Sequence, residues 1–433
     1  MLRFAIAALV AVFSVGTVGP AAADRRSGPP GAQLERRTPI CNGRQEQDAP
    51  VVKLVTMGIG SLIWERHGHI ALCVCYEDRR EDRCYNYGIG DFRNPAKMGW
   101  GFFRGTNSFW VGRSPPEEMM AIYRHTDRTI WSQPIALTPA QKTQVIDKLE
   151  HDILEENKYY SYDHFWDNCT TRVRDILDDA TGGQLKETTN TPTDGKTFRD
   201  LARDGFYPMR PALLITDLFM GRTTDRVPNY WERMFLPQYL REAVIKRWNV
   251  QPTIVYERQG EAVIADHKLC SDGSIVGQTD VCTPETPSGR VLFAFVVLLL
   301  TAPVWLTRLW GRFQRLGLAV AVVPASILGL VLWLIAILSP LPYVRWNEAL
   351  LILMPFDLLL LFLSPTRRRT YAKGRVVMLG LVAVLMLVGV LQQPLWFILP
   401  WTLIPAAVVG FWPAKPVAEV AATPVVKPTK KSA

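Results

Sequence analysis

One cysteine is a candidate for chemistry because it lies at the start of a predicted helix. Cys169 follows a polar and aromatic stretch that begins at Tyr159, and after it apolar residues recur at helical intervals. A helix N-terminus presents unpaired N–H groups and the positive end of the peptide dipoles, so it lowers the pKa of a thiol and can hold an oxyanion. The sequence therefore indicates a cysteine nucleophile. The alternative is that Cys169 is a buried small apolar residue or a disulfide partner.

A nucleophilic cysteine needs a base within hydrogen-bond reach, and histidine is the usual one. His69 begins a predicted strand, whose rigid backbone would aim the side chain. His164, shortly before Cys169, competes for this role, and His67 could instead form a His-x-His metal pair with His69. The sequence contains no Cys/His cluster at zinc-ligand spacing, no Gly-rich phosphate loop and no G-x-S-x-G elbow. We therefore expect neither a metal nor an organic cofactor.

Several polar residues are candidates for supporting roles in such a site. Asn86, Tyr87 and Asp91 lie on or near a predicted return strand, and periodicity does not decide which of them orients the histidine. Tyr162 and Asn168 are candidates for the wall of the site, and each suits a packing or capping role equally well.

Asp357 is a separate candidate because it lies, just after Pro355, inside an apolar segment. An ionisable side chain near the centre of a membrane span costs roughly 2.5 to 3.5 kcal/mol on insertion scales, so it is rarely present without a reason. One interpretation is that Asp357 is paired inside a helical bundle or lies near a helix end. The other is that it shapes a polar notch facing the active site, where a lipid headgroup or an ammonium group sits.

The elements that must position these residues indicate an α+β domain. Residues 51–56 and 69–76 have strand composition, and residues 84–89 are predicted to form the second strand of a hairpin with residues 69–76. Thr138, Pro139 and Gln141 make an N-cap, a first-turn proline and a capping-box partner, which predicts a helix over residues 139–157. A second helix follows Cys169.

Both ends of the chain point to the cell envelope. Residues 1–23 read as a secretory signal peptide, with an uncleaved anchor as the alternative, and residues 24–49 read as a flexible lead-in. After a domain over residues 50–289, a transmembrane bundle is predicted over residues 290–413 and a cytoplasmic tail over residues 414–433. The bundle is expected to contain five apolar segments, at about 291–306, 316–338, 349–363, 376–391 and 395–412.

The basic residues near the C-terminus predict the orientation of this bundle. Arg308, Arg312 and Arg315 fall in one predicted loop, and a second loop holds the basic residues of 367–375. Because Lys and Arg accumulate on the cytoplasmic side, the large domain is expected to face outward. The same loops account for much of the formal net charge of +9, so no nucleic-acid partner is predicted.

The cysteine count supports the same compartment. An exported domain can form disulfides, and seven cysteines leave at least one thiol unpaired within the chain. Cys75 and Cys84 flank a predicted hairpin turn and are expected to pair, with the register open by one step. Cys270 and Cys282 are expected to form a second, local disulfide.

A series of short motifs occurs along the chain in a fixed order. The motifs are Gly68-His69-Ile-Ala-Leu, Tyr85-Asn-Tyr-Gly-Ile-Gly, Phe103-Arg-Gly, Asp127-Arg-Thr-Ile, Leu137-Thr, Tyr160-Ser-Tyr, Asn168-Cys-Thr-Thr-Arg-Val-Arg-Asp and Met234-Phe-Leu-Pro.

In order and spacing, this series resembles the periplasmic domain of Lnb-type bacterial lipoprotein N-acyltransferases. The resemblance runs from about residue 50 to 250, and the helices that follow are also similar. Those proteins are similar in turn to a rearranged, permuted papain-like fold of NlpC/P60 type, in which the histidine strand precedes the cysteine helix. The resemblance implies that Cys169 corresponds to the nucleophile and His69 to its base.

What the resemblance implies is a multi-pass enzyme of the bacterial inner membrane with its large domain in the periplasm. The implied reaction moves an acyl chain from a membrane phospholipid, through a thioester on Cys169, to the α-amino group of a diacylglyceryl lipoprotein. Two alternatives stay open. One is an NlpC/P60-like hydrolase of peptidoglycan or phospholipid, and the other is a non-catalytic envelope assembly protein.

Overall fold

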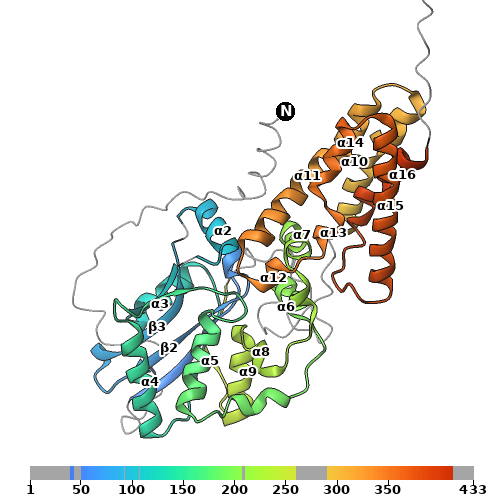
Figure 1. Ribbon diagram of the computed structural model, residues 1–433. Coiled ribbons are helices and arrows are strands. Elements are labelled where there is room, and N and C mark those ends of the chain that lie inside the picture. Colours follow the sequence, from blue (N-terminus) through green and yellow to red (C-terminus); the bar gives the residue numbers. More distant parts are fainter. Residues whose placement is uncertain are drawn as a thin grey trace, which may run out of the picture. The chain divides into compact units, whose positions relative to one another are not determined.

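The computed structural model describes residues 40–42, 50–91, 93–106, 108–206, 210–259 and 290–412. The chain forms two compact units, both drawn in Figure 1. The first comprises Met1–Gly289 and Ile335–Asn347, and the second comprises Arg290–Leu334 and Glu348–Ala433. The predicted signal peptide, most of the lead-in, the Cys270–Cys282 pair and the tail lie outside the described residues.

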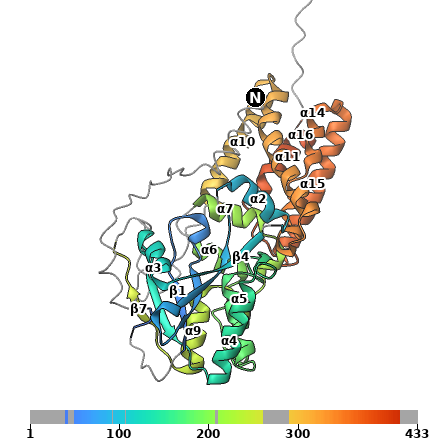
Figure 2. The same ribbon diagram turned by 90° about the vertical axis from the view of Figure 1, so that its left-hand side faces the viewer.

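A seven-stranded antiparallel sheet is the framework of the first unit (Figure 2). Its strand order is β6-β4-β3-β2-β1-β5-β7, so the three strands predicted from the sequence lie side by side at its centre. Those predictions are confirmed as β1, β2 and β3. The strands are β1 Val51–Met57, β2 His69–Cys75, β3 Arg83–Ile89, β4 Ser108–Ser114, β5 Ile130–Pro134, β6 Tyr159–Ser161 and β7 Thr253–Tyr256.

Helices cover both faces of this sheet, which confirms the predicted α+β class (Figure 1). Alternate residues of β2 point to opposite faces. Ile70 and Leu72 pack in a core with residues of α4, α5 and α9, whereas Ala71 packs with residues of α3. The helices of this unit are α2 Pro95–Phe103, α3 Pro116–His125, α4 Pro139–Asp152, α5 Cys169–Ala180, α6 Phe198–Gly205, α7 Arg210–Phe219, α8 Tyr230–Arg233 and α9 Pro237–Trp248, with a short α12 Pro342–Arg345.

The predicted helix start at Thr138 is confirmed by its hydrogen bonds. The Thr138 side chain accepts from the Gln141 N–H at 3.4 Å, and the Gln141 side chain accepts from the Thr138 N–H at 2.9 Å. The helix ends at Asp152, before the predicted residue 157. Residues 153–157 form turns there, including a hydrogen bond from the Asn157 N–H to the Leu154 carbonyl at 2.9 Å.

Cys75 and Cys84 do not pair as expected, because the residue opposite Cys84 is Cys73, two positions along the strand from Cys75. Arg83 pairs with Val74 across the ladder, which sets Cys84 opposite Cys73, and those two cysteines are bonded. Cys75 is bonded instead to Cys41, at a sequence separation of 34. Two disulfides in the first unit fit an oxidising compartment.

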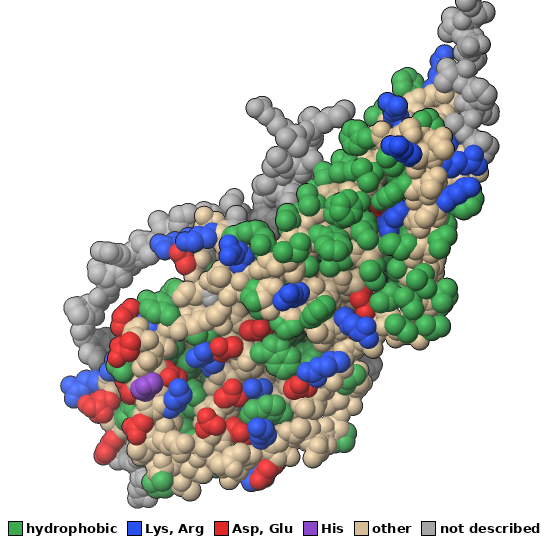
Figure 3. All heavy atoms as spheres, in the orientation of Figure 1, with side chains coloured by type: hydrophobic (Ala, Val, Ile, Leu, Met, Phe, Trp, Pro, Cys, Tyr) green, Lys and Arg blue, Asp and Glu red, His purple; other side chains and the backbone are tan. Residues whose placement is uncertain are grey.

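Three helices of the second unit are long and apolar enough to cross a membrane, namely α10 Arg290–Trp310, α11 Gln314–Leu338 and α15 Pro365–Leu387. The apolar helix α16 Leu399–Phe411 is shorter. Much of the surface of this unit is hydrophobic (Figure 3). These helices confirm the first two apolar segments that the sequence predicts.

The third predicted segment, 349–363, is not a spanning helix. It is divided into α13 Ala349–Ile352, the 3-10 helix η6 Pro355–Leu358 and α14 Leu359–Phe362. Pro355 begins a new element because it cannot donate to a preceding turn. The basic residues of 367–375 were predicted to form a loop, but they form the first turns of α15.

One segment between the apolar helices belongs to the first unit. Residues 335–347 include α12, and the Gly221 N–H donates to the Tyr343 carbonyl at 2.5 Å. The Asn347 side chain donates to the Leu218 carbonyl at 2.7 Å. The first unit is therefore discontinuous in sequence.

Candidate active site

The start of α5 is held in place by Asn168. Its side-chain oxygen accepts from the N–H groups of Thr170 and Thr171 at 2.8 and 2.9 Å. Its side-chain nitrogen donates to the carbonyls of His164 and Phe235 at 2.7 and 3.0 Å. Of the two roles left open for Asn168, the structure shows the capping role. The cap fixes the position of Cys169, the first residue of the helix.

The Cys169 thiol is buried, with 9% of the residue exposed, and it is a free cysteine. Burial raises the pKa of the thiol above its ordinary value, although the Thr170 side chain and the N–H groups of Ile70, Thr170 and Cys169 favour the thiolate. The predicted lowering of this pKa is therefore wrong in direction, because desolvation outweighs the helix start. The resting thiol is protonated at neutral pH.

A bulge in the sheet makes room for this thiol. The pairing of β2 with β3 ends at Leu72 and Tyr85, and the register of β3 shifts between Asn86 and Ile89. Within the bulge, Gly88 has a φ of +84°. A Cβ on Gly88 would lie 3.4 Å from the Cys169 Cβ and 3.5 Å from a ring carbon of Tyr162. The Cys169 thiol thus lies beside the N–H of Ile70, near the start of the central strand β2.

His69 lies on the face of β2 that packs against α3. Its ring stacks on Tyr123, with the centroids 5.9 Å apart and the planes 23° apart. Burial and then repulsion by Arg128 lower the pKa of His69 to about 3, while the Asn86 side chain raises it. The imidazole is therefore neutral at pH 7.

Asn86 is the residue that the structure brings to His69. Its side-chain nitrogen lies 3.6 Å from the Met119 sulfur, and its buried oxygen has no hydrogen-bond partner within the described ranges. A protonated His69 would supply the missing donor. Tyr87 instead donates to Asp152 at 2.8 Å, and the exposed Asp91 pairs with Arg93 at 2.7 Å.

Cys169 and His69 interact with the same two residues, but no hydrogen bond joins them in the part of the chain that the structure describes. Tyr123 stacks on His69 and also interacts electrostatically with Cys169. Arg128 likewise interacts with both. Catalytic hydrogen bonds are often long in a site without substrate and tighten when substrate binds.

His67 and His164 have other contacts. The His67 ring nitrogen contacts the Ala202 carbonyl at 3.0 Å, and the ring packs against His164 with the centroids 5.1 Å apart. His67 therefore does not form the predicted His-x-His pair with His69, because the two rings have separate surroundings. Burial lowers the pKa of His67 to about 3 and that of His164 to about 4.

Two tyrosines line the thiol. The Tyr162 ring packs against Phe109, with the centroids 4.4 Å apart, so it has the packing contact that the sequence left open as an alternative to a place in the wall. The Tyr160 hydroxyl is buried without a hydrogen-bond partner among the described residues, and it lies 3.7 Å from the position of a Cβ on Gly88. A buried, unsatisfied O–H beside the thiol is a candidate donor to an oxyanion.

Arg128 is a site residue that the sequence argument missed. Its side chain is 4% exposed, donates to the Gly58 carbonyl at 2.7 Å and lies over the Tyr123 ring at 4.8 Å. A carboxylate oxygen of Glu65 lies 3.8 Å from Nη1 of Arg128. The sequence feature that could have indicated Arg128 is the Asp127-Arg-Thr-Ile motif, which leads into a buried strand.

Asp357 lies in the second unit and is paired there. Its two carboxylate oxygens accept from Arg375 at 2.7 and 2.8 Å, and the Tyr371 hydroxyl donates to it at 3.0 Å. This agrees with the interpretation that Asp357 is neutralised inside the helical region. We assign it no role in the site.

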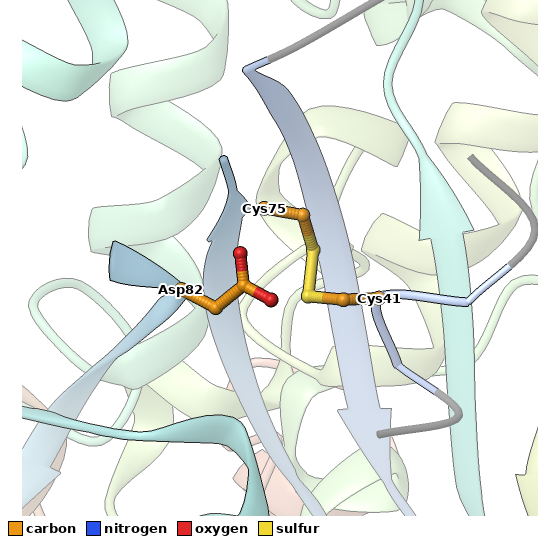
Figure 4. A group of neighbouring side chains, drawn as sticks. All are labelled: Cys41, Cys75 and Asp82. Atoms are coloured by element: carbon orange, nitrogen blue, oxygen red, sulfur yellow. A yellow bond between two sulfur atoms is a disulfide. The ribbon is translucent and has the colours of Figure 1, made fainter. Parts of the chain in front are cut away.

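One cluster among the described residues has the composition of a metal site. Cys41, Cys75 and Asp82 offer ligand atoms within 4.8 Å of one another (Figure 4). Both sulfurs are consumed in the Cys41–Cys75 disulfide, and Asp82 accepts from the Tyr76 N–H at 2.7 Å. The cluster is a disulfide with a neighbouring carboxylate, because a bonded sulfur is no longer a thiolate ligand.

Comparison with known families gives one match for this domain. Residues 44–204 match the family described as the Lnb N-terminal periplasmic domain. This segment of the chain is Lnb-like. The match covers less than half of the chain, but it includes His69, Asn86 and the Cys169 helix start. No curated protein and no solved structure matches the chain.

Gly88 offers a test of how tightly the Lnb-like domain positions its thiol. We expect Gly88→Ala to lose about 1 to 2 kcal/mol of unfolding free energy, because a side chain is strained at positive φ. If Cys169 is a nucleophile, we also expect about 10- to 100-fold lower activity, because relief of this strain shifts the bulge against which Cys169 packs and small misplacements are costly. Thermal unfolding and a turnover assay give the two values.

Gly182→Ala is the matched control for this variant. Gly182 also has a positive φ, of +68°, but a Cβ there meets no atom within 4 Å. It should lose similar stability and keep its activity. Equal activities of the two variants would show that the bulge does not position the thiol.

Proposed function

We propose that this protein is a membrane-anchored cysteine acyltransferase with a papain-like arrangement of Cys169, His69 and Asn86. Three observations support the proposal: a free thiol at a capped helix start, a neutral imidazole that shares the neighbours Tyr123 and Arg128 with this thiol, and an amide oxygen that lacks a donor. The match of residues 44–204 to the Lnb N-terminal periplasmic domain supports the same function. The apolar helices α10, α11 and α15 supply a membrane anchor.

The first half-reaction forms a thioester. Cys169 Sγ attacks the ester carbonyl of a membrane phospholipid while His69 takes the thiol proton. The negative charge that develops on the carbonyl oxygen is held by the Cys169 N–H and the Tyr160 hydroxyl. The ester C–O bond then breaks, and His69 returns the proton to the departing lysophospholipid. Arg128 supplies a fixed positive charge near this negative charge.

The second half-reaction transfers the acyl group to an amine. The neutral α-amino group of a diacylglyceryl lipoprotein attacks the thioester carbonyl, and His69 removes a proton from the nitrogen. The C–S bond breaks, the thiol is reprotonated and an amide is formed. A buried thiol favours this outcome over hydrolysis, because water is largely excluded from the site.

A hydrolase is the second candidate function, and it differs only in the group that resolves the thioester. The three apolar helices favour a lipid substrate over peptidoglycan, because they keep the domain at a bilayer. A non-catalytic assembly protein is the third candidate. It is disfavoured because nothing in such a role requires a free thiol beside a neutral histidine.

The test uses the full chain in vesicles that contain a phospholipid with isotopically labelled acyl chains. Without acceptor, intact mass should show one labelled acyl group on Cys169. With a diacylglyceryl lipopeptide, the label should appear as an amide on its N-terminus. Labelled free fatty acid without amide would establish the hydrolase instead.

Two further outcomes are informative. An N-acylated lipopeptide of unchanged mass and without label would show that the lipopeptide's own ester is the donor. Absence of any acyl transfer, to enzyme, water or amine, would overturn the enzymatic proposal.

A further inference from the structure

A cluster of arginines in the second unit lacks the negative charge that would balance it. Arg308 near the end of α10 and Arg369 in the first turns of α15 both donate to the end of α16, at the carbonyls of Trp412 and Gly410, at 2.7 and 2.9 Å. Arg308 repels Arg368 and Arg369 electrostatically, and Arg368 repels Arg315. We call Arg308, Arg315, Arg368 and Arg369 the arginine cluster.

The second unit has no carboxylate available for this cluster within residues 290–412. Glu348 and Asp357 are the acidic residues of the described part of the unit. Glu348 accepts from the Gln393 N–H at 2.8 Å, and Asp357 is paired with Arg375. The end of α16 contributes only about half a negative charge through its peptide dipoles, against four guanidinium groups.

Two of the guanidinium groups also have unused donors. The Nε–H groups of Arg308 and Arg368 are buried and have no hydrogen-bond partner among the residues described. Of the other nitrogens, Nη1 and Nη2 of Arg308 donate to Gln314 and to the Trp412 carbonyl, and Nη2 of Arg368 donates to the Leu363 carbonyl. A buried N–H without an acceptor is costly, so the arrangement indicates a missing acceptor.

We propose that the arginine cluster is a binding site for the phosphate headgroup of an anionic phospholipid. A phosphate supplies both the negative charge and several acceptor oxygens, and it matches the planar donors of Arg. A lipid is favoured over free phosphate because exposed apolar side chains lie at the same helix ends, with Trp310 71% and Phe313 73% exposed. Figure 3 shows basic side chains on the otherwise hydrophobic surface of this unit.

The site belongs to the cytoplasmic leaflet if the orientation predicted from loop charges holds. Anionic lipids are concentrated in that leaflet, and basic pockets between transmembrane helices are a known way of recognising them. The proposal is independent of acyl transfer, because it concerns other residues and a different ligand.

Native mass spectrometry of the full chain in detergent tests this proposal. The protein is titrated with dioleoylphosphatidylglycerol, with dioleoylphosphatidylcholine or with inorganic phosphate. We expect the anionic lipid to be retained at least 10-fold more strongly than phosphatidylcholine. The double variant Arg308→Gln/Arg368→Gln should reduce this preference to about 2-fold or less.

The matched control is Arg312→Gln/Arg367→Gln. It removes the same charge from the same two chain segments, but Arg312 and Arg367 are exposed and contribute no buried unsatisfied donor. It should keep most of the preference. If both double variants lost the lipid preference equally, general surface charge would explain the binding and the proposed site would be wrong. Equal retention of both lipids by the wild-type protein would also overturn it.

Two more measurements keep the result interpretable. Arg308→Lys/Arg368→Lys keeps the charge but lacks the Nε–H donors, and it replaces the glutamine variant if the glutamine variant fails to fold. It should lose the preference for anionic lipid to a similar extent. If the lysine variant instead kept the wild-type preference, the proposed hydrogen bonds to the phosphate would be wrong. Displacement of the lipid by an equal concentration of inorganic phosphate would identify a free-phosphate site instead of a lipid site.

Discussion

Replacing Cys169 with alanine is expected to lower acyl transfer by about 10⁴-fold or more, because loss of a nucleophile removes the covalent route altogether. The fold should remain, since the change removes one buried sulfur atom and leaves the Asn168 cap untouched. The loss of unfolding free energy should be about 1 kcal/mol or less on the scale of one buried methylene-sized group. Single-turnover formation of the thioester and thermal unfolding measure the two effects.

Alkylation of the thiol gives an independent test of its state. Because burial raises the pKa of Cys169, iodoacetamide should label it more slowly at pH 7 than a cysteine in an unstructured peptide, and the rate should rise with pH. Labelling must be absent in Cys169→Ala. Rapid labelling at pH 6 would contradict the protonated resting thiol and favour a preformed thiolate and imidazolium pair.

Replacing His69 with alanine is expected to lower acyl transfer by about 10²- to 10⁴-fold, the usual contribution of a general base. Asn86→Ala should have a smaller effect, of about 10-fold, because it acts through the orientation of His69. Asn86→Gln should not restore activity, since its longer side chain displaces the oxygen. Both half-reactions should slow together, because His69 moves a proton in each.

His67→Gln is the control for burial, because His67 is also a buried neutral histidine whose pKa is lowered to about 3. A depressed histidine pKa contributes stability that is present above the unfolded value, about 6.5, and is lost as pH falls through the folded value. His67→Gln should therefore keep its acyl transfer and reduce the loss of stability between pH 6.5 and pH 4. If His67→Gln instead abolished acyl transfer at pH 7, the loss of activity in His69→Ala would no longer identify His69 as the general base.

The parts of the fold that sequence predicts well are those fixed by neighbouring residues. The capping box at Thr138 and the helix that starts at Cys169 both depend on contacts within a few residues. The central strands follow from their local apolar and β-branched composition. For the same reason the candidate pair Cys169 and His69 could be chosen from the sequence.

Contacts between distant segments decide the rest. The partner of Cys75 is Cys41, which no local rule selects, and the hairpin register moves the other bond from Cys75 to Cys73. The bulge at Gly88 decides that Asn86, and neither Tyr87 nor Asp91, lies beside His69. Desolvation of the thiol likewise arises only when helix and sheet are packed, so the direction of its pKa shift was not predictable.

The discontinuity of the first unit has a consequence for the order of biogenesis. Within that unit, Tyr343 packs edge-on against Phe165, with ring centroids 4.9 Å apart, four residues before Cys169. The chain reaches Tyr343 only after the whole of α11 has been synthesised. Packing of the first unit is therefore incomplete until the segment that follows α10 and α11 has been synthesised, so the region just before Cys169 reaches its final contacts only late in synthesis.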